Sequence, residues 1–261
     1  NVLCLISEYV YDVDENIISE FYYTQETVNE EIVDVISESY TREYSGENMT
    51  SEIYQNRVDG ELVNQEKAVY SYDDKENITN ESVCQWISNA WYQTYCEEYT
   101  YNNYGNVLSQ TTSEYKNTVN AETGLVETTS DIVTVTYEYD VWNQQVKVTE
   151  SVNGTESTIT TVVYDALGRV VSVAKDDELT AYTYDSKDNI LTVTEGEEVT
   201  TYTYSDNGNL ISRTHPNGTV ASYVYDSYGN LTNHAFNGYA FTYNTLGSIL
   251  TANSESGQLV N

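Results

Sequence analysis

The chain has 261 residues, which is long enough for one large domain or two small ones. Its 42 Asp and Glu residues against 10 Lys and Arg give a formal net charge of −32, which argues against nucleic acid as a partner because phosphate binding needs basic residues. No run of about 18 apolar residues could insert into a membrane as a helix. The abundance of Thr, Val and Tyr, with 27 tyrosines, excludes a helical bundle.

A short unit recurs along the N-terminal half of the chain in degraded form. In each copy a tyrosine is followed by Asp or Asn, and the copies begin at Tyr11, Tyr72, Tyr101 and Tyr139. Their spacing, and that to the next unit, ranges from 25 to 61 residues. We therefore expect insertions or decayed units between them.

The same unit becomes regular from residue 164 onward. Five copies follow one another, and their first tyrosines lie 18 to 21 residues apart. The residues that define the repeat are Tyr164, Asp165, Gly168, Tyr184, Asp185, Tyr204, Gly208, Tyr225, Asp226, Gly229, Tyr243 and Gly247.

The unit has a direct structural interpretation. A short acceptor side chain after Tyr, with Gly three residues later, indicates a type I turn in which the Gly has a positive φ. Flanking residues alternate, as in Tyr182-Thr183-Tyr184, which predicts strands of about 5–7 residues. One face should carry Tyr, Leu and Val, and the other Thr, Ser and the charges. Because one hairpin cannot bury its face alone, we predict an all-β repeat array of antiparallel β-hairpins forming one coiling sheet.

The five units, whose common form is Tyr-Asp-x-x-Gly, resemble those of the YD-repeat family, also called rearrangement-hotspot (RHS) repeats. The resemblance implies a β-strip that spirals into a hollow shell. In bacterial toxin-shell proteins such a shell encloses a toxin, and in teneurin-like proteins it forms the barrel of a large cell-surface adhesion molecule. Family shells are closed by a segment rich in Asp-Pro. This chain has a single proline, Pro216, and no such segment.

The repeat quality divides the chain into three segments of one continuous repeat domain. Residues 1–70 hold degenerate repeats, residues 71–163 hold clearer repeats with insertions, and residues 164–261 hold the five regular repeats.

No catalytic, cofactor-binding or metal-binding constellation is legible, so we predict that the protein is not an enzyme. His215 and His234 have no cysteine partner at zinc-ligand spacing. Asp12 to Asn16 has alternating acidic oxygens but lacks the glycine and the twelfth-position Glu of a calcium loop, which favours a turn. The tyrosines that recur on every second strand are interpreted first as packing residues and second as a sugar-binding surface.

Cys84 and Cys96 flank a predicted hairpin. A three-residue turn at residues 89–91 would place them opposite each other, close enough for a disulfide. Cys4 would then be the unpaired thiol.

These patterns favour a non-catalytic structural scaffold outside the cell, most simply of a bacterium. It would serve as a shell segment or as a head-to-tail filament. The expected partners are neighbouring YD-repeat segments, in the same parent chain or by end-to-end self-association through the strands at residues 1–7 and 257–261. A glycan-binding adhesion module and part of a toxin-enclosing shell stay open as alternatives.

Overall fold

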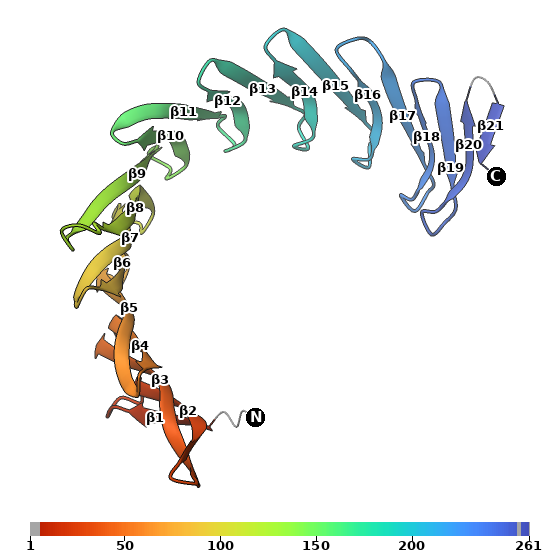
Figure 1. Cartoon of the computed structure of the whole chain (residues 1–261). Coiled ribbons are helices and arrows are strands. Elements are labelled where there is room, and N and C mark those ends of the chain that lie inside the picture. The colour runs from red at the N-terminus through yellow and green to blue at the C-terminus, as the bar shows by residue number, and fades with distance from the viewer. Residues whose placement is uncertain (1–5, 255–256, 261) are drawn as a thin grey trace. The chain divides into compact units, whose positions relative to one another are not determined.

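The computed structural model describes residues 6–254 and 257–260 (Figure 1). Over these ranges the chain forms β-strands joined by turns and contains no helix. Accordingly, no helix within them is long and apolar enough to cross a membrane. The predicted all-β array of antiparallel hairpins is confirmed. Cys4 and most of the predicted first strand lie outside the described residues.

The strands of the N-terminal half are long, from 6 residues in β1 to 15 in β3. From β1 to β8, each strand pairs antiparallel with the next one in the chain. Their bounds are β1 Ile6–Tyr11, β2 Ile17–Val28, β3 Glu31–Ser45, β4 Asn48–Val58, β5 Glu61–Tyr72, β6 Ile78–Ile87, β7 Ala90–Tyr101, β8 Val107–Val119 and β9 Val126–Tyr139.

The strands of the C-terminal half are shorter, and from β12 to β20 they have 5 to 7 residues, as the repeat spacing predicts. They follow one another as hairpins in the same way (Figure 1). Their bounds are β10 Gln145–Val152, β11 Thr155–Tyr164, β12 Val170–Lys175, β13 Glu178–Tyr184, β14 Ile190–Glu195, β15 Glu198–Tyr204, β16 Leu210–Thr214, β17 Val220–Tyr225, β18 Leu231–Phe236, β19 Tyr239–Tyr243, β20 Ile249–Ser254 and β21 Gly257–Val260.

The chain groups into two compact units. The first comprises residues 1–138 and 149–157, and the second comprises residues 139–148 and 158–261. The three repeat segments expected from the sequence stay a prediction, as does the coiling of the sheet over its whole length.

Turns of two kinds join most of the strands, namely Tyr-Asp turns and tight two-residue turns. The Tyr-Asp turns have a left-handed residue three positions after the Asp, or after the Ser or Asn that replaces it. Examples are Gly208, three positions after Ser205, at φ 82° and Gly229, three positions after Asp226, at φ 86°. The predicted positive φ of these two glycines is confirmed. The register shifts by one residue at each such tyrosine, as between Thr203 and Tyr204, which is the bulge expected after a type I turn.

The wide spacing of the repeat motifs in the N-terminal half comes from long hairpins without a Tyr-Asp turn. Strands β2 to β5 are joined by tight turns at residues 29–30, 46–47 and 59–60, each with at least one residue at positive φ. Strand lengths of 5–7 residues, extrapolated from the C-terminal repeats, are therefore wrong for this half. The longer strands take up the residues that looked like insertions.

The sheet has little core. Among the described residues only six side chains are buried, and all are small. They are Ser39, Ser51, Cys96, Ser113, Ala221 and Ala252. Most other side chains on the strands are half-buried, so the fold rests on the backbone ladder and on cross-strand neighbours rather than on a packed interior.

The two faces agree with the prediction in the second unit and differ from it in the first. In the second unit, Tyr182 lies opposite Val193 while Thr183 lies opposite Thr192 on the other face. In the first unit, glutamates share the tyrosine face, since Glu20 lies opposite Tyr40 and Tyr54 opposite Glu66. Bulges within the long strands shift the alternation, which hides this arrangement in the sequence.

Candidate functional site: the inter-repeat contacts

Each Tyr-Asp turn is held by its own aspartate. In the turn at Asp165, Oδ1 accepts hydrogen bonds from the backbone amides of Leu167 at 2.9 Å and Arg169 at 3.0 Å. The same geometry recurs at Asp185 and Asp226. The pKa of each aspartate lies below its usual value because hydrogen bonds favour the carboxylate. The largest cause is the side-chain hydrogen bond from Asn189 at Asp185 and from Asn230 at Asp226, and the backbone amide of Arg169 at Asp165. The Asp is therefore a turn-forming group.

In two of the five regular repeats, at Tyr164 and Tyr184, the tyrosine joins the hairpin around its own Tyr-Asp turn to the preceding one. The Tyr184 hydroxyl donates to the backbone carbonyl of Val170 at 2.6 Å, and the Tyr164 hydroxyl donates to that of Gln145 at 2.9 Å. In every case the acceptor is at the start of the strand that follows the previous turn. The equivalent bonds in the first unit are Tyr44 to Ile17, Tyr72 to Met49 and Tyr101 to Ile78.

Cations reach from one turn to the next. Arg169 Nη1 donates to the Asp185 carbonyl at 3.0 Å and to Asp188 Oδ1 at 2.8 Å, while its Nε bonds Asp165 within its own turn. Lys187 Nζ donates to the carbonyl of Asp206 at 2.6 Å. In the first unit, Lys75 makes the matching bond to the Asn103 carbonyl at 2.8 Å.

A second kind of hydrogen bond lies at the end of a hairpin opposite its Tyr-Asp turn. Asp176 starts a tight turn, donates its amide to the Ile159 carbonyl at 2.8 Å and accepts from the Ile159 amide through Oδ1. Asn153 makes the same pair of bonds with Ile132. These bonds hold together the two strands of one Tyr-Asp hairpin at the end opposite its turn, whereas the tyrosine bonds connect successive hairpins.

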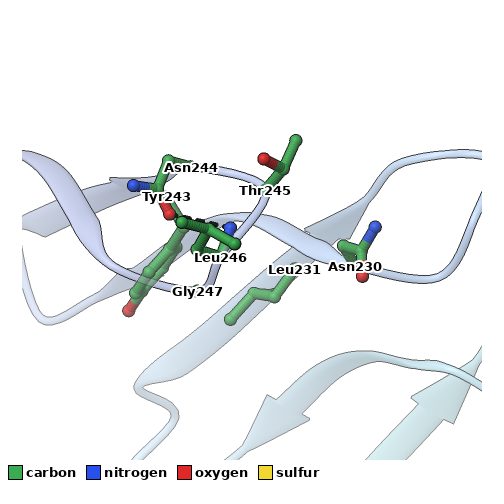
Figure 2. A pocket seen from close by; sticks show the side chains of 7 residues that line it. All are labelled: Asn230, Leu231, Tyr243, Asn244, Thr245, Leu246 and Gly247. Carbon is green, nitrogen blue, oxygen red and sulfur yellow. Dashed lines mark hydrogen bonds between the residues drawn. The ribbon is translucent and has the colours of Figure 1, made fainter.

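A cleft lies between consecutive Tyr-Asp turns. Figure 2 shows the one lined by Asn230 and Leu231 and by the turn from Tyr243 to Gly247, with a volume of about 360 Å³. A larger cleft of about 510 Å³ has the same position between an earlier pair of turns. It is lined by Trp142, Gln144, Tyr164, Asp165, Ala166 and Gly168.

The two clefts differ in the exposed apolar side chain that lines them, which comes from the first turn of the pair in one cleft and from the second turn in the other. Trp142 is 78% exposed and presents an indole, whereas Leu246 is 89% exposed and presents an aliphatic group. The Gln144 amide lies against Gly168, where an added Cβ would be 3.1 Å from Nε2. Sequence reasoning missed the Trp142 cleft because it joins residues more than 20 positions apart.

The structure separates the other residues that the sequence singled out. His215 stands in the Asp position of a turn and its ring lies tilted against Phe236, and His234 stacks between Tyr223 and Phe241. No group of three or more His, Cys, Asp or Glu residues suited to a metal is found in the described part of the chain. Asp12 forms the Asp-type turn with Asn16, consistent with the turn interpretation.

Cys84 and Cys96 are not directly opposite each other. The turn has two residues, Ser88 and Asn89, and a bulge places Cys84 opposite Gln93 and Cys96 opposite Ser82. The predicted three-residue turn is wrong for this reason. Both thiols are free, on neighbouring strands and diagonal to each other. Their disulfide stays a prediction.

Comparison with known proteins places the chain in a family. The sequence model of one family, described as teneurin YD-shell, matches residues 6–259. No curated protein matches the sequence. Among solved structures, the Tc holotoxin pore of Photorhabdus luminescens is 13% identical, with a TM-score of 0.36, over 98% of this chain and 19% of that chain.

A DUF3836 family protein from Bacteroides vulgatus is also similar, with 27% identity, a TM-score of 0.25 and coverage of 36% of this chain and 97% of its own. The chain spans only 19% of the Tc toxin chain that it matches. The family match, by contrast, extends over nearly the whole sequence. The protein therefore belongs to the teneurin YD-shell family.

Proposed function

We propose that the protein is a non-catalytic structural scaffold, a segment of an extracellular β-shell built from YD repeats. The observation that carries this proposal is the repeated tyrosine bond to the preceding hairpin, as from Tyr184 to Val170. Such a bond uses only backbone and one side chain, so any number of hairpins can be added in register. The family match over residues 6–259 supports the same role.

The partners of such a scaffold are further YD-repeat segments. The terminal strands β1 and β21 would pair with strands of a neighbouring segment, in the same parent chain or in a second copy, because strand edges recruit other strands. In β1, Tyr9 and Val10 are 43% and 39% exposed, and the strand carries one charge, Glu8.

Electron microscopy of the purified protein tests this role. The scaffold predicts discrete shell-like particles or end-to-end filaments in physiological salt. A variant lacking residues 1–7 should lose end-to-end contacts while keeping its β-sheet circular dichroism spectrum. Monomers without such assemblies at tens of micromolar, for both proteins, would contradict self-association and leave only joining within a parent chain.

A second candidate function is glycan binding, and the Trp142 cleft is the observation that favours it. An exposed indole beside amide and carboxylate groups suits the apolar face and hydroxyls of a sugar ring. A glycan array with the native protein and with Trp142→Ala tests it. Leu246→Ala, which removes an exposed apolar side chain from the other cleft, is the control. Binding lost only in Trp142→Ala supports this role, and no binding to any glycan contradicts it.

A further inference from the structure

One face of the first unit carries a glutamate on each of seven successive strands. The pairing registers place these residues on the same face as the tyrosines of the long hairpins. We call this surface the glutamate–tyrosine face. Its glutamates, from β2 to β8, are Glu20, Glu38, Glu52, Glu66, Glu81, Glu97 and Glu114, and its tyrosines are Tyr22, Tyr40, Tyr54, Tyr70, Tyr95 and Tyr99.

The opposite face of the same strands has a different chemistry. It holds the buried small residues Ser39, Ser51, Cys96 and Ser113. The first unit carries 29 of the 42 acidic residues of the chain and five of its ten Lys and Arg residues. The negative charge is therefore concentrated in the first unit. Within that unit, the seven glutamates form a continuous row along one face.

One guanidinium already occupies this face. Arg42 donates from Nε to Glu52 Oε2 at 2.5 Å and from Nη2 to Glu20 Oε2 at 3.1 Å. Its guanidinium carbon lies 5.6 Å from the centre of the Tyr40 ring, and Tyr40 stacks on Tyr54 at 5.0 Å. Two carboxylates from different strands and a tyrosine ring thus form a complete arginine-binding arrangement.

Carboxylates of different strands and tyrosine rings also lie together farther along the face, where no arginine is present. Glu81 lies directly opposite Glu97 on neighbouring strands, an arrangement that costs stability unless a cation lies between them. Tyr70 lies opposite Glu81, and Tyr95 lies opposite Glu114. Burial and then the neighbouring carboxylates, that of Glu81 foremost, raise the pKa of Tyr70, which reflects the negative field here.

Two kinds of carboxylate make up the row. Glu97 is held in place by hydrogen bonds from the Tyr99 hydroxyl at 2.5 Å and the Gln110 amide at 2.9 Å. Burial opposes its ionisation, but these bonds outweigh burial and keep its pKa below the usual value. Glu66, Glu81 and Glu114 have no hydrogen bond or ion pair to another residue of the described part of the chain.

We propose that the glutamate–tyrosine face is a docking surface for an extended, arginine-rich peptide segment. Strands lie about 4.8 Å apart, so carboxylates on successive strands form a row that long arginine side chains can follow. Charge complementarity selects a cationic partner, and the tyrosine rings favour guanidinium groups over ammonium groups. The contacts of Arg42 show how an arginine of the peptide would bind. The proposal does not depend on the scaffold role.

Fluorescence anisotropy with labelled nona-arginine tests the proposal at about 0.15 M salt. We expect saturable binding, tighter than for nona-lysine of equal charge. Glu66→Gln combined with Glu81→Gln should weaken binding about five-fold, as expected for the loss of two exposed ion pairs. The matched control is Asp34→Asn combined with Glu98→Gln, which removes the same charge from the opposite face and should leave binding nearly unchanged.

Three results would overturn the proposal. The two double variants could weaken binding equally, which would show a diffuse charge effect. Spermine could displace the peptide as effectively, per charge, as unlabelled nona-arginine, which would make the face a general cation surface. The native chain could show no saturable binding up to about 100 µM peptide. Circular dichroism of each variant verifies that the sheet is intact.

Discussion

The turn glycines are the positions at which backbone geometry most restricts the residue type. Gly208 has a φ of 82°, and an added Cβ would meet nothing closer than Asn189 Oδ1 at 4.0 Å. Space is therefore available, and the cost of a substitution is conformational. We expect Gly208→Val and Gly229→Val each to lower the free energy of unfolding by more than about 1 kcal/mol, because β-branched residues tolerate this region poorly.

Gly208→Asn is the matched control, because Asn is among the side chains that accept the left-handed region. Asn143 already has a φ of 66° at the equivalent position of another turn. Urea denaturation should show a clearly smaller loss of stability for this variant than for Gly208→Val. Equal stability of all three variants and the native chain would contradict the assignment of these turns.

The turn aspartates should give the fold an acid-sensitive contribution. The pKa of Asp185 is lowered first by the hydrogen bond from the Asn189 side chain and further by backbone amides, so the unfolded chain binds the proton more tightly. The contribution is therefore complete above the unfolded value near 3.8 and is lost as pH falls through the folded pKa.

Asp185→Asn isolates this contribution. Asn102 and Asn244 accept the same backbone hydrogen bonds in other turns, so Asn keeps the turn but does not titrate. The stability difference between native protein and variant should be constant between pH 5 and pH 7 and should shrink below about pH 4. Thermal melts across this range measure it. A difference that does not change with pH would contradict the account of the Asp turn.

At the scale of elements, the hairpin β6–β7 combines a diagonal cysteine pair with a Trp86–Trp91 pair whose rings are 4.9 Å apart. A disulfide oxidant such as oxidised glutathione would take two electrons from Cys84 and Cys96 and leave one intramolecular bond. The diagonal register requires a small backbone adjustment. We expect mass spectrometry to show loss of 2 Da in the peptide pair, and we expect the melting temperature to rise.

Cys84→Ser is the control, since it should abolish both the mass change and the shift in melting temperature. Cys84 is half-buried, and burial raises the pKa of its thiol, so oxidation should be slow near neutral pH. Mixed disulfides with glutathione at either cysteine, without an intramolecular bond, would contradict the pairing.

The regular repeats could be predicted from the sequence, whereas the arrangement of the long strands could not. The repeat from Tyr164 to Gly247 specifies turn, bulge and strand alternation locally, so the hairpins and the positive φ of Gly208 could be read directly. The long strands β2 to β8 contain bulges, for example between Tyr54 and Gln55, that change which residues share a face. The row of glutamates and the diagonal position of Cys84 depend on these bulges and left no signal in the sequence.

The same reasoning explains the missed joining tyrosine. Tyr44 bonds the Ile17 carbonyl like the repeat tyrosines, yet it is followed by Ser45 and Gly46 rather than by the Asp motif. The tyrosine and the aspartate thus have separable tasks, one joining hairpins and the other forming the turn. The Trp142 cleft was missed for a related reason, because two successive turns had to be placed side by side first.

At the scale of the whole molecule, net charge should govern stability. With a net charge of −32 and few buried residues, like charges oppose folding, and salt should screen them. We expect the melting temperature to rise between low salt and about 0.2 M NaCl, where the Debye length is about 7–8 Å. Calorimetry measures it. A flat or falling curve would show that the carboxylates are already compensated.

The tyrosine bonds between hairpins are the central claim, and the free energy of unfolding of two double variants tests them most directly. Tyr164→Phe with Tyr184→Phe removes two joining hydroxyls and keeps both rings. The control, Tyr104→Phe with Tyr228→Phe, alters turn tyrosines that are 80% and 90% exposed. We predict a loss of about 2 kcal/mol for the first pair and a change within about 0.5 kcal/mol for the second. Equal changes in both pairs would contradict the claim that these bonds hold the array together.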